Sequence, residues 1–262
     1  MKNGYALING AQLYYETDGH GYPLFLVHGM GLDHRMWDGQ FATFANNYEV
    51  IRYDLRGFGR SSLPTAESYA HHTDLKSLME YLGHSKAHLT GLSMGGRVVM
   101  DFAIAFPEMV ASLIMVDSTI HGYKNKNDLT GSITTAAAAG GAKAANEAWL
   151  NHDLFIPARR NAAVAGQLAQ MVNDYSGWHW VNKNPWTPID PPAITKLNKI
   201  TAPSLIIVGE KDVPDFRDMA DLLHEQIPGS RIEIIKDVGH MSNMEDTATF
   251  NKLVLDFLSP AV

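Results

Sequence analysis

The chain has 262 residues, of which 45% are hydrophobic and 19% are charged, and its formal net charge is −7. This length allows one large domain with a substantial buried core, and a negative charge without any basic run argues against nucleic acid and anionic membranes as partners. The sequence contains no cysteine, which excludes disulfide bonds, thiolate metal sites and a cysteine nucleophile.

The first residues predict a β-hairpin rather than a targeting segment. Strand-like residues lie on both sides of Asn9-Gly10, a dipeptide that tight hairpin turns favour. No apolar stretch typical of a signal peptide or of a membrane-spanning helix follows it. Together with the lack of cysteine, this leads us to expect a cytoplasmic protein, monomeric or homodimeric, that binds neither membranes nor nucleic acid.

Short apolar runs then alternate with helical patterns. The runs are typical of strands covered on both faces, and they lie at 24–27, 50–53, 88–90, 113–116, 204–208 and 232–235. Apolar residues at helical spacing occur between them, at 75, 78, 79 and 82, and again at 250, 253, 254 and 257. Alternating strands and helices predict an α/β fold with a mostly parallel sheet.

Residues 119–192 interrupt this alternation. The segment has no good strand signal; it is rich in alanine, becomes helical again after Pro157, and ends in an aromatic stretch broken by prolines. A segment of this length is too long for a simple connection. We predict a helical cap that is inserted after the sixth strand into a core formed by residues 1–118 and 193–262. A helical excursion packed against the side of the core is the alternative.

The most informative motif is the segment 91–96, with the sequence GLSMGG, between a strand-like and a helix-like run. G-x-S-x-G on a strand-to-helix turn is the pattern of a nucleophile elbow. The turn is so tight that a side chain at Gly91 or Gly95 would collide with neighbouring backbone, and the serine is forced into a strained conformation that lifts its hydroxyl out of the sheet. We therefore predict Ser93 as a nucleophile, with a structural Gly/Ser turn as the alternative.

A serine hydroxyl needs a base, and the base needs a group that orients it. Asp212 follows the strand at 204–208, and His240 follows the strand at 232–235. The order serine, acid, histidine is the one expected for an elbow-type hydrolase, so we predict the triad Ser93, Asp212 and His240. Asp117, which ends the strand at 113–116, is the alternative acid, although it also suits capping the next turn.

An oxyanion hole needs two backbone N–H donors. Met94, directly after the nucleophile, is expected to supply one of them. The other is expected from Met30, in the loop His28–Gly31, whose glycines let the main chain approach a ligand closely. We expect His28 to anchor this loop.

With these residues, the whole chain resembles a capped α/β-hydrolase of the group that contains esterases, enol-lactonases, cofactor-free haloperoxidases and C–C bond hydrolases. The resemblance implies the α/β-hydrolase fold: an eight-stranded, mostly parallel sheet with its second strand antiparallel, helices on both faces, and an inserted helical cap that shapes substrate choice. It also implies that Asp54 and Arg56 fix a turn. The motifs that carry it are His28–Gly31, Asp54–Ser61, Gly91–Gly96, Gly209–Asp212 and Gly239-His240.

A serine at the elbow implies acyl transfer, because relatives that displace at saturated carbon carry aspartate there. We predict a carboxylesterase-type serine hydrolase that cleaves small to medium esters with apolar groups through an acyl-enzyme. An enol-lactonase, a C–C bond hydrolase and a perhydrolase-type haloperoxidase would use the same triad. A ligand-sensing receptor of the same fold is a further alternative.

Four side chains are candidates for the substrate pocket: Trp178, Trp180, Trp186 and Met241. Packing within the cap explains the tryptophans equally well. The pair His71-His72 does not predict a metal site, because adjacent helical residues point about 100° apart and no third ligand is visible. No phosphate loop or dinucleotide fingerprint occurs. We therefore expect no cofactor, no metal, and a small-molecule ester as the partner.

Overall fold

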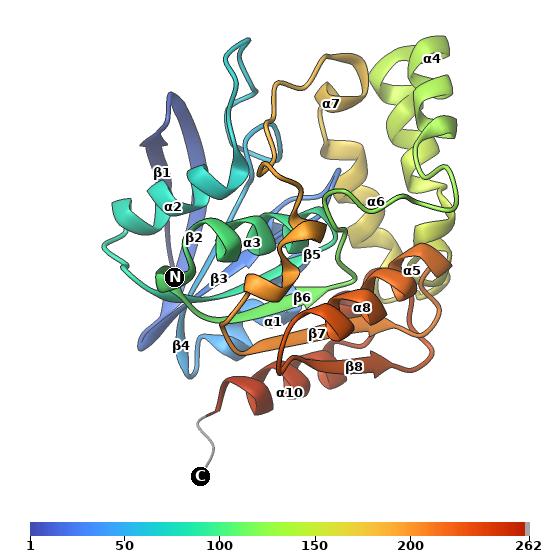
Figure 1. The fold of residues 1–262 in the computed structure, drawn as a ribbon. Coiled ribbons are helices and arrows are strands. Elements are labelled where there is room, and N and C mark those ends of the chain that lie inside the picture. Colours follow the sequence, from blue (N-terminus) through green and yellow to red (C-terminus); the bar gives the residue numbers. More distant parts are fainter. Residues whose placement is uncertain (260–262) are drawn as a thin grey trace.

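The chain begins with the hairpin that Asn9-Gly10 predicts. In the computed structural model, which describes residues 1–259, β1 (Lys2–Ile8) pairs antiparallel with β2 (Ala11–Gly19). Both turn residues have positive φ, 47° at Asn9 and 74° at Gly10, as the tight hairpin turn requires. The hairpin forms one edge of the sheet (Figure 1).

The sheet has eight strands in the order β1-β2-β4-β3-β5-β6-β7-β8. β2 is antiparallel to both of its neighbours, and the pairs from β4 to β8 are parallel. Every strand predicted from an apolar run lies within an observed one, so the predicted fold is confirmed. The six strands are β3 (Tyr22–Val27), β4 (Tyr48–Tyr53), β5 (Ala87–Leu92), β6 (Val110–Val116), β7 (Ser204–Gly209) and β8 (Arg231–Ile235).

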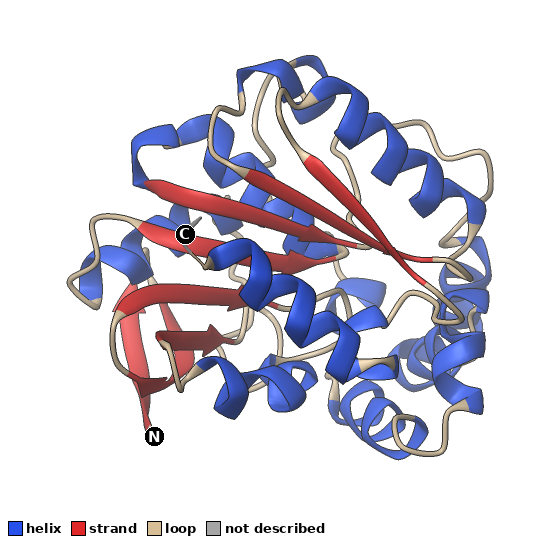
Figure 2. Cartoon of the chain, turned by 90° about the horizontal axis from the view of Figure 1, so that it is seen from below, coloured by secondary structure: helices blue, strands red, loops and turns tan. Residues whose placement is uncertain are grey.

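Helices cover both faces of the sheet (Figures 1 and 2). The predicted periodic residues point into the core: Leu75, Leu78 and Met79 are fully buried, as are Phe250 and Val254. Each helix lies between the sheet and solvent, so its apolar residues gather on the face that packs against the sheet. The core helices are α1 (Asp38–Phe44), α2 (His71–Tyr81), α3 (Met94–Ala105), α8 (Pro214–Gln226), α9 (Ser242–Glu245) and α10 (Thr247–Leu258), with short 3₁₀ turns at His34–Trp37 and Pro107–Met109.

Between β6 and β7 the described chain contains helices and loops and no strand of the sheet. Figure 1 shows α4, α6 and α7 grouped on the side of the molecule opposite β1 and α2. α4 is interrupted at Gly140 and Gly141, whose dihedral angles leave the helical region. The helices are α4 (Gly131–Leu150), α5 (Ile156–Arg160), α6 (Ala165–Asp174) and α7 (Trp178–Val181). In residues 1–259, no helix combines the length and apolar character needed to cross a membrane.

Candidate active site

Ser93 lies on a strained turn between β5 and α3. Its φ of 57° and ψ of −114° are unfavourable for a residue with a side chain. A Cβ atom at Gly91 would lie 2.2 Å from the Gly95 carbonyl oxygen, and one at Gly95 would lie 2.2 Å from the Val27 carbonyl oxygen. The glycines are therefore required by backbone contact, as the motif predicts.

The backbone of Ser93 is bonded to the end of β6. Its N–H donates to the Val116 carbonyl at 2.8 Å, and its carbonyl accepts from the Thr119 N–H at 3.2 Å. These bonds hold the strained turn against the neighbouring strand. Ser93 lines a cavity of about 390 Å³, whose wall also includes Met30 and Met94.

Asp212 and His240 form a buried hydrogen-bonded pair. Asp212 follows β7 and His240 follows β8, and the Nδ1 of His240 lies 2.8 Å from the Oδ2 of Asp212. A carboxylate can only accept, so Nδ1 carries the ring proton and Nε2 is left as a free acceptor. The other Asp212 oxygen accepts the Val213 N–H at 2.7 Å. This pair can orient a base.

Glu245 fixes the loop that carries His240. Its two carboxylate oxygens accept the N–H groups of Gly239 and Met241, at 2.8 and 3.1 Å, on either side of the histidine. Burial raises the pKa of Glu245. No sequence motif indicates Glu245, because a carboxylate that binds the backbone four and six residues earlier leaves no local pattern.

Phe216 connects the histidine with the cavity. Its ring centroid lies 4.3 Å from that of His240, and Phe216 lines the same cavity as Ser93. Among the described residues, no hydrogen bond joins the Ser93 hydroxyl to His240. The hydrogen bond between Asp212 and His240 is therefore present, while the roles of the three residues as a triad stay a prediction. In enzymes such contacts often tighten only around a substrate.

Asp117 is a second buried acid at this site, and its role differs from the turn cap that we expected. Its Oδ1 accepts the Gly209 N–H at 2.8 Å, and its Oδ2 accepts the Ser242 hydroxyl at 2.5 Å. Burial and the nearby charge of Asp212 raise the pKa of Asp117 well above its usual value. Both partners come from segments far along the chain, which local sequence patterns cannot indicate.

The loop after β3 holds Met30 beside the cavity. The Nε2 of His28 accepts the Leu55 N–H at 2.9 Å, so its Nδ1 carries the proton and donates to the Gly29 carbonyl at 2.8 Å. That carbonyl and the Met30 N–H belong to one trans peptide and point in opposite directions. His28 therefore anchors the loop and turns the Met30 N–H away from itself. Burial lowers the pKa of His28, which favours the neutral imidazole.

Met94 is the first residue of α3, a position whose N–H has no partner inside the helix. It can therefore point a backbone donor toward the end of the Ser93 side chain. The segment between β6 and β7 also supports the loop of Met30, because the Trp149 indole N–H donates to the Met30 carbonyl at 3.2 Å. Trp149 lies at the end of α4, and the sequence analysis did not single it out.

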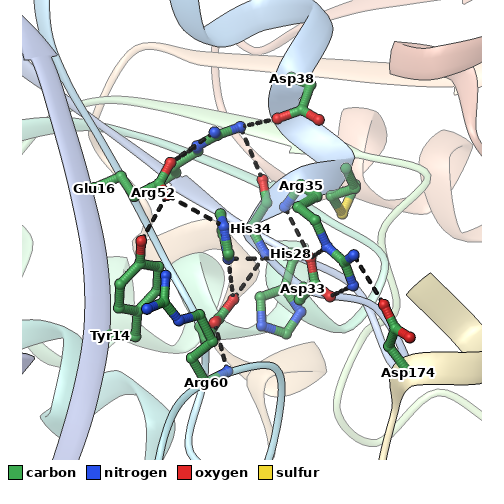
Figure 3. Close-up of polar contacts among 12 residues, drawn as sticks. Tyr14, Glu16, His28, Asp33, His34, Arg35, Asp38, Arg52, Arg60 and Asp174 are labelled. Carbon is green, nitrogen blue, oxygen red and sulfur yellow. Dashed lines mark hydrogen bonds and ion pairs between the residues drawn. The ribbon is translucent and has the colours of Figure 1, made fainter. Parts of the chain in front are cut away.

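Buried ion pairs fix the rest of this loop, as Figure 3 shows. Arg35 donates to both oxygens of Asp33, at 2.9 and 2.6 Å. His34 lies 2.7 Å from Asp54 through its Nδ1, and Arg52 binds Glu16 at 2.6 Å. This network attaches the loop to β2 through Glu16 and to β4 through Arg52. Asp54 acts as the turn-fixing residue that the resemblance implies, since its Oδ2 also accepts the Arg60 N–H.

Two groups of side chains bring possible metal ligands within 4.8 Å of one another: Asp33, His34 and Asp54, and Asp117, Asp212 and His240. In both groups, protein N–H or O–H donors already bind the carboxylate oxygens. This bonding favours a hydrogen-bonded role for these acids over metal ligation.

The four pocket candidates separate in the structure. Trp180 lines the cavity of Ser93, whereas Trp178, Trp186 and Met241 are not among its lining residues. Met241 is fully buried in the core. Trp186 lies under the guanidinium of Arg97, which does line the cavity. The sequence analysis missed Arg97.

Comparison with known proteins supports the fold and a hydrolytic activity. Residues 22–247 match a family model described as alpha/beta hydrolase fold. The putative carbamate hydrolase RutD of Azorhizobium caulinodans is 28% identical, with 97% of this chain and 97% of that protein covered. Carboxylesterase YbfK of Bacillus subtilis is also 28% identical, over 90% of this chain and 79% of that protein. The enol-lactonase from Burkholderia xenovorans superposes with a TM-score of 0.81 at 25% identity, covering 97% of this chain and 99% of that one.

Proposed function

The chain belongs to the α/β-hydrolase fold family, and on that basis we propose that it is a serine hydrolase that cleaves small to medium carboxylic esters with apolar groups. The relatives named as a carboxylesterase, a carbamate hydrolase and an enol-lactonase all imply attack on a carbonyl carbon. The observation that carries the proposal for this chain is the buried Asp212–His240 pair, because it leaves one ring nitrogen free as a base.

In the proposed mechanism, His240 Nε2 takes the proton of the Ser93 hydroxyl as Ser93 attacks the ester carbonyl. Asp212 stabilises the imidazolium that forms. The N–H groups of Met30 and Met94 bind the oxyanion. His240 then gives its proton to the leaving alcohol, and a water molecule that it deprotonates releases the acid from Ser93.

The surroundings of the cavity support esters with apolar groups. Met30, Leu154 and Trp180 line it together with Ser93, so an acyl or alkyl chain would find apolar contacts there. Lactones, vinylogous diketones and peracid formation would use the same groups. They are therefore separated by substrate tests rather than by the site geometry.

The first test compares the wild-type protein and Ser93→Ala on p-nitrophenyl esters, lactones and vinylogous diketones. We expect ester turnover that falls by a factor on the order of 10⁴ to 10⁶ in Ser93→Ala, with an unchanged circular dichroism spectrum. A tenfold loss, or wild-type turnover of lactones or diketones without turnover of any ester, would contradict the proposal.

A further inference from the structure

Arg97 lies beside the proposed nucleophile without a close carboxylate partner. It follows Ser93 by one turn of α3, and both residues line the same cavity. Its ion pair in residues 1–259 is with Asp101, whose Oδ2 lies 3.9 Å from the Arg97 Nε. That separation is too long for a hydrogen bond. The Nε is buried and has no hydrogen-bond partner among the described residues.

In three other arginines, both the Nε and a terminal nitrogen donate hydrogen bonds to a carboxylate. Arg52 donates through Nε and one terminal nitrogen to a single oxygen of Glu16, Oε2, at 2.9 and 2.6 Å. Arg56 instead forms a fork with both oxygens of Asp74, at 3.0 and 2.9 Å, and Arg35 does the same with Asp33 (Figure 3). This fork matches the geometry of a carboxylate. Of the four arginines, Arg97 is the one whose Nε has no acceptor among the described residues.

Aromatic stacking, rather than ion pairing, holds the Arg97 guanidinium in place. Its Cζ lies 4.3 Å from the centre of the Trp186 ring. Trp186 belongs to the segment between β6 and β7, so the cap fixes the plane of the guanidinium against α3. A ring on one face leaves the N–H edge available for a ligand. His121 is a further titratable residue in the cavity wall.

The electrostatics are consistent with an unfilled anion site. Burial lowers the pKa of Arg97, which is the sign of a cation that its surroundings do not fully compensate. Asp101 compensates poorly, because burial raises its pKa to about 6 and its Oδ2 lies 3.9 Å from the Arg97 Nε, beyond hydrogen-bond distance. A carboxylate entering the cavity would supply the missing negative charge and acceptors for the terminal nitrogens of Arg97.

We propose that Arg97 binds a carboxylate group of the substrate, so that the ester cleaved at Ser93 is part of an anionic molecule. This inference rests on the proposed function, since it places the substrate in the cavity of Ser93. Four residues of helix separate the two side chains, about 6 Å along the axis. A spacer of a few carbons between the ester and the carboxylate fits that distance, and the apolar wall would contact the spacer.

The test uses esters matched in shape but not in charge. Monoethyl adipate is compared with ethyl 6-methylheptanoate, in which an isopropyl group replaces the carboxylate. A second pair, 4-acetoxybutanoate and 4-methylpentyl acetate, places the charge on the alcohol side instead of the acyl side. Hydrolysis is followed by pH-stat, and the readout is the ratio of kcat/KM for the charged ester to that for the neutral ester.

We expect the wild-type protein to prefer the charged member of at least one pair tenfold or more. Arg97→Gln should lower that ratio at least 50-fold, mainly through KM, and Arg97→Lys should lower it less because the charge stays while the fork is lost. Arg217→Gln, which removes an exposed arginine of α8, is the matched charge control and should keep the wild-type ratio. Equal preference in wild type and Arg97→Gln for both pairs would overturn the inference.

A binding measurement separates this inference from the proposed function. Calorimetry measures the affinity of Ser93→Ala for monoethyl adipate and for 4-acetoxybutanoate, and the same experiment is repeated in the Ser93→Ala/Arg97→Gln double variant. Binding that weakens tenfold or more on loss of Arg97 supports the carboxylate site even where wild-type protein hydrolyses no ester. Binding of the same strength in both proteins contradicts it, whatever the activity.

Discussion

At the scale of single residues, two carboxyl groups lie near one imidazole but in different environments. Asp212 is hydrogen-bonded to His240, whereas the bonds of Asp117 go to Gly209 and Ser242. Burial and the charge of Asp212 raise the pKa of Asp117. The hydrogen bond to His240 Nδ1 makes Asp212 the acid of the proposed triad.

These different hydrogen bonds predict unequal effects of two conservative substitutions. Asp212→Asn should lower kcat by up to about 10⁴, because asparagine stabilises the wrong histidine tautomer. Asp117→Asn keeps the size of a side chain whose hydrogen bonds go to Gly209 and Ser242 rather than to His240, and it should lower kcat less than tenfold. Steady-state kinetics on the preferred p-nitrophenyl ester checks both. A larger loss for Asp117→Asn would mean that the two acids have exchanged roles.

The residues that the sequence indicates are those whose chemistry depends on local backbone. The strained φ of Ser93 and the crowded glycines follow from a tight turn, which the GLSMGG motif encodes directly. Glu245, Trp149 and Arg97 act through contacts with other segments or with a cavity wall. The type of a residue in a single sequence does not indicate which distant residues it contacts.

At the scale of elements, α3 carries both the backbone N–H of Met94 and the buried carboxyl group of Asp101. This side chain is 1% exposed, and burial raises its pKa to about 6. The folded protein therefore binds a proton between about pH 4 and pH 6 that the unfolded chain releases near pH 4. The contribution of Asp101 to the free energy of unfolding is therefore largest at low pH, and it is lost as the pH rises through about 6.

Asp101→Asn removes this pH-dependent loss. The quantity of interest is the free energy of unfolding of Asp101→Asn minus that of the wild type. We expect this difference to be more positive at pH 6.5 than at pH 4, by on the order of 2 kcal/mol. Urea unfolding at the two pH values measures it. Asp221→Asn, an exposed acid of α8, is the control and should give the same difference at both. A constant difference for Asp101→Asn would show that this carboxyl group titrates normally.

Elements were predictable wherever one periodicity dominates. Continuous apolar runs identified the buried parallel strands, and the i, i+3, i+4, i+7 spacing identified α2 and α10. The segment between β6 and β7 was predicted only as helical, because its Ala-rich part has weak amphipathic character. The break of α4 at Gly140-Gly141 and the short α7 are set by packing between helices that no single window of sequence describes.

At the scale of the whole molecule, the parallel strands deliver four loops to one end of the sheet. Ser93, Asp117, Asp212 and His240 follow β5, β6, β7 and β8, which are neighbours in the sheet. The topology therefore brings the chemistry together, as expected for the carboxyl ends of an open parallel sheet. The cavity could not be predicted from the sequence, because Trp149 and Trp180, from the segment between β6 and β7, form its wall together with Phe216 of α8.

The central claim is that these loops activate Ser93 through His240. The most direct measurement is labelling with a p-nitrophenyl phosphonate ester, followed by release of p-nitrophenolate and by peptide mass spectrometry. We predict one adduct, on Ser93, formed at least 100-fold more slowly in His240→Ala. An adduct on another residue, or equal labelling rates in wild type and His240→Ala, would contradict the account.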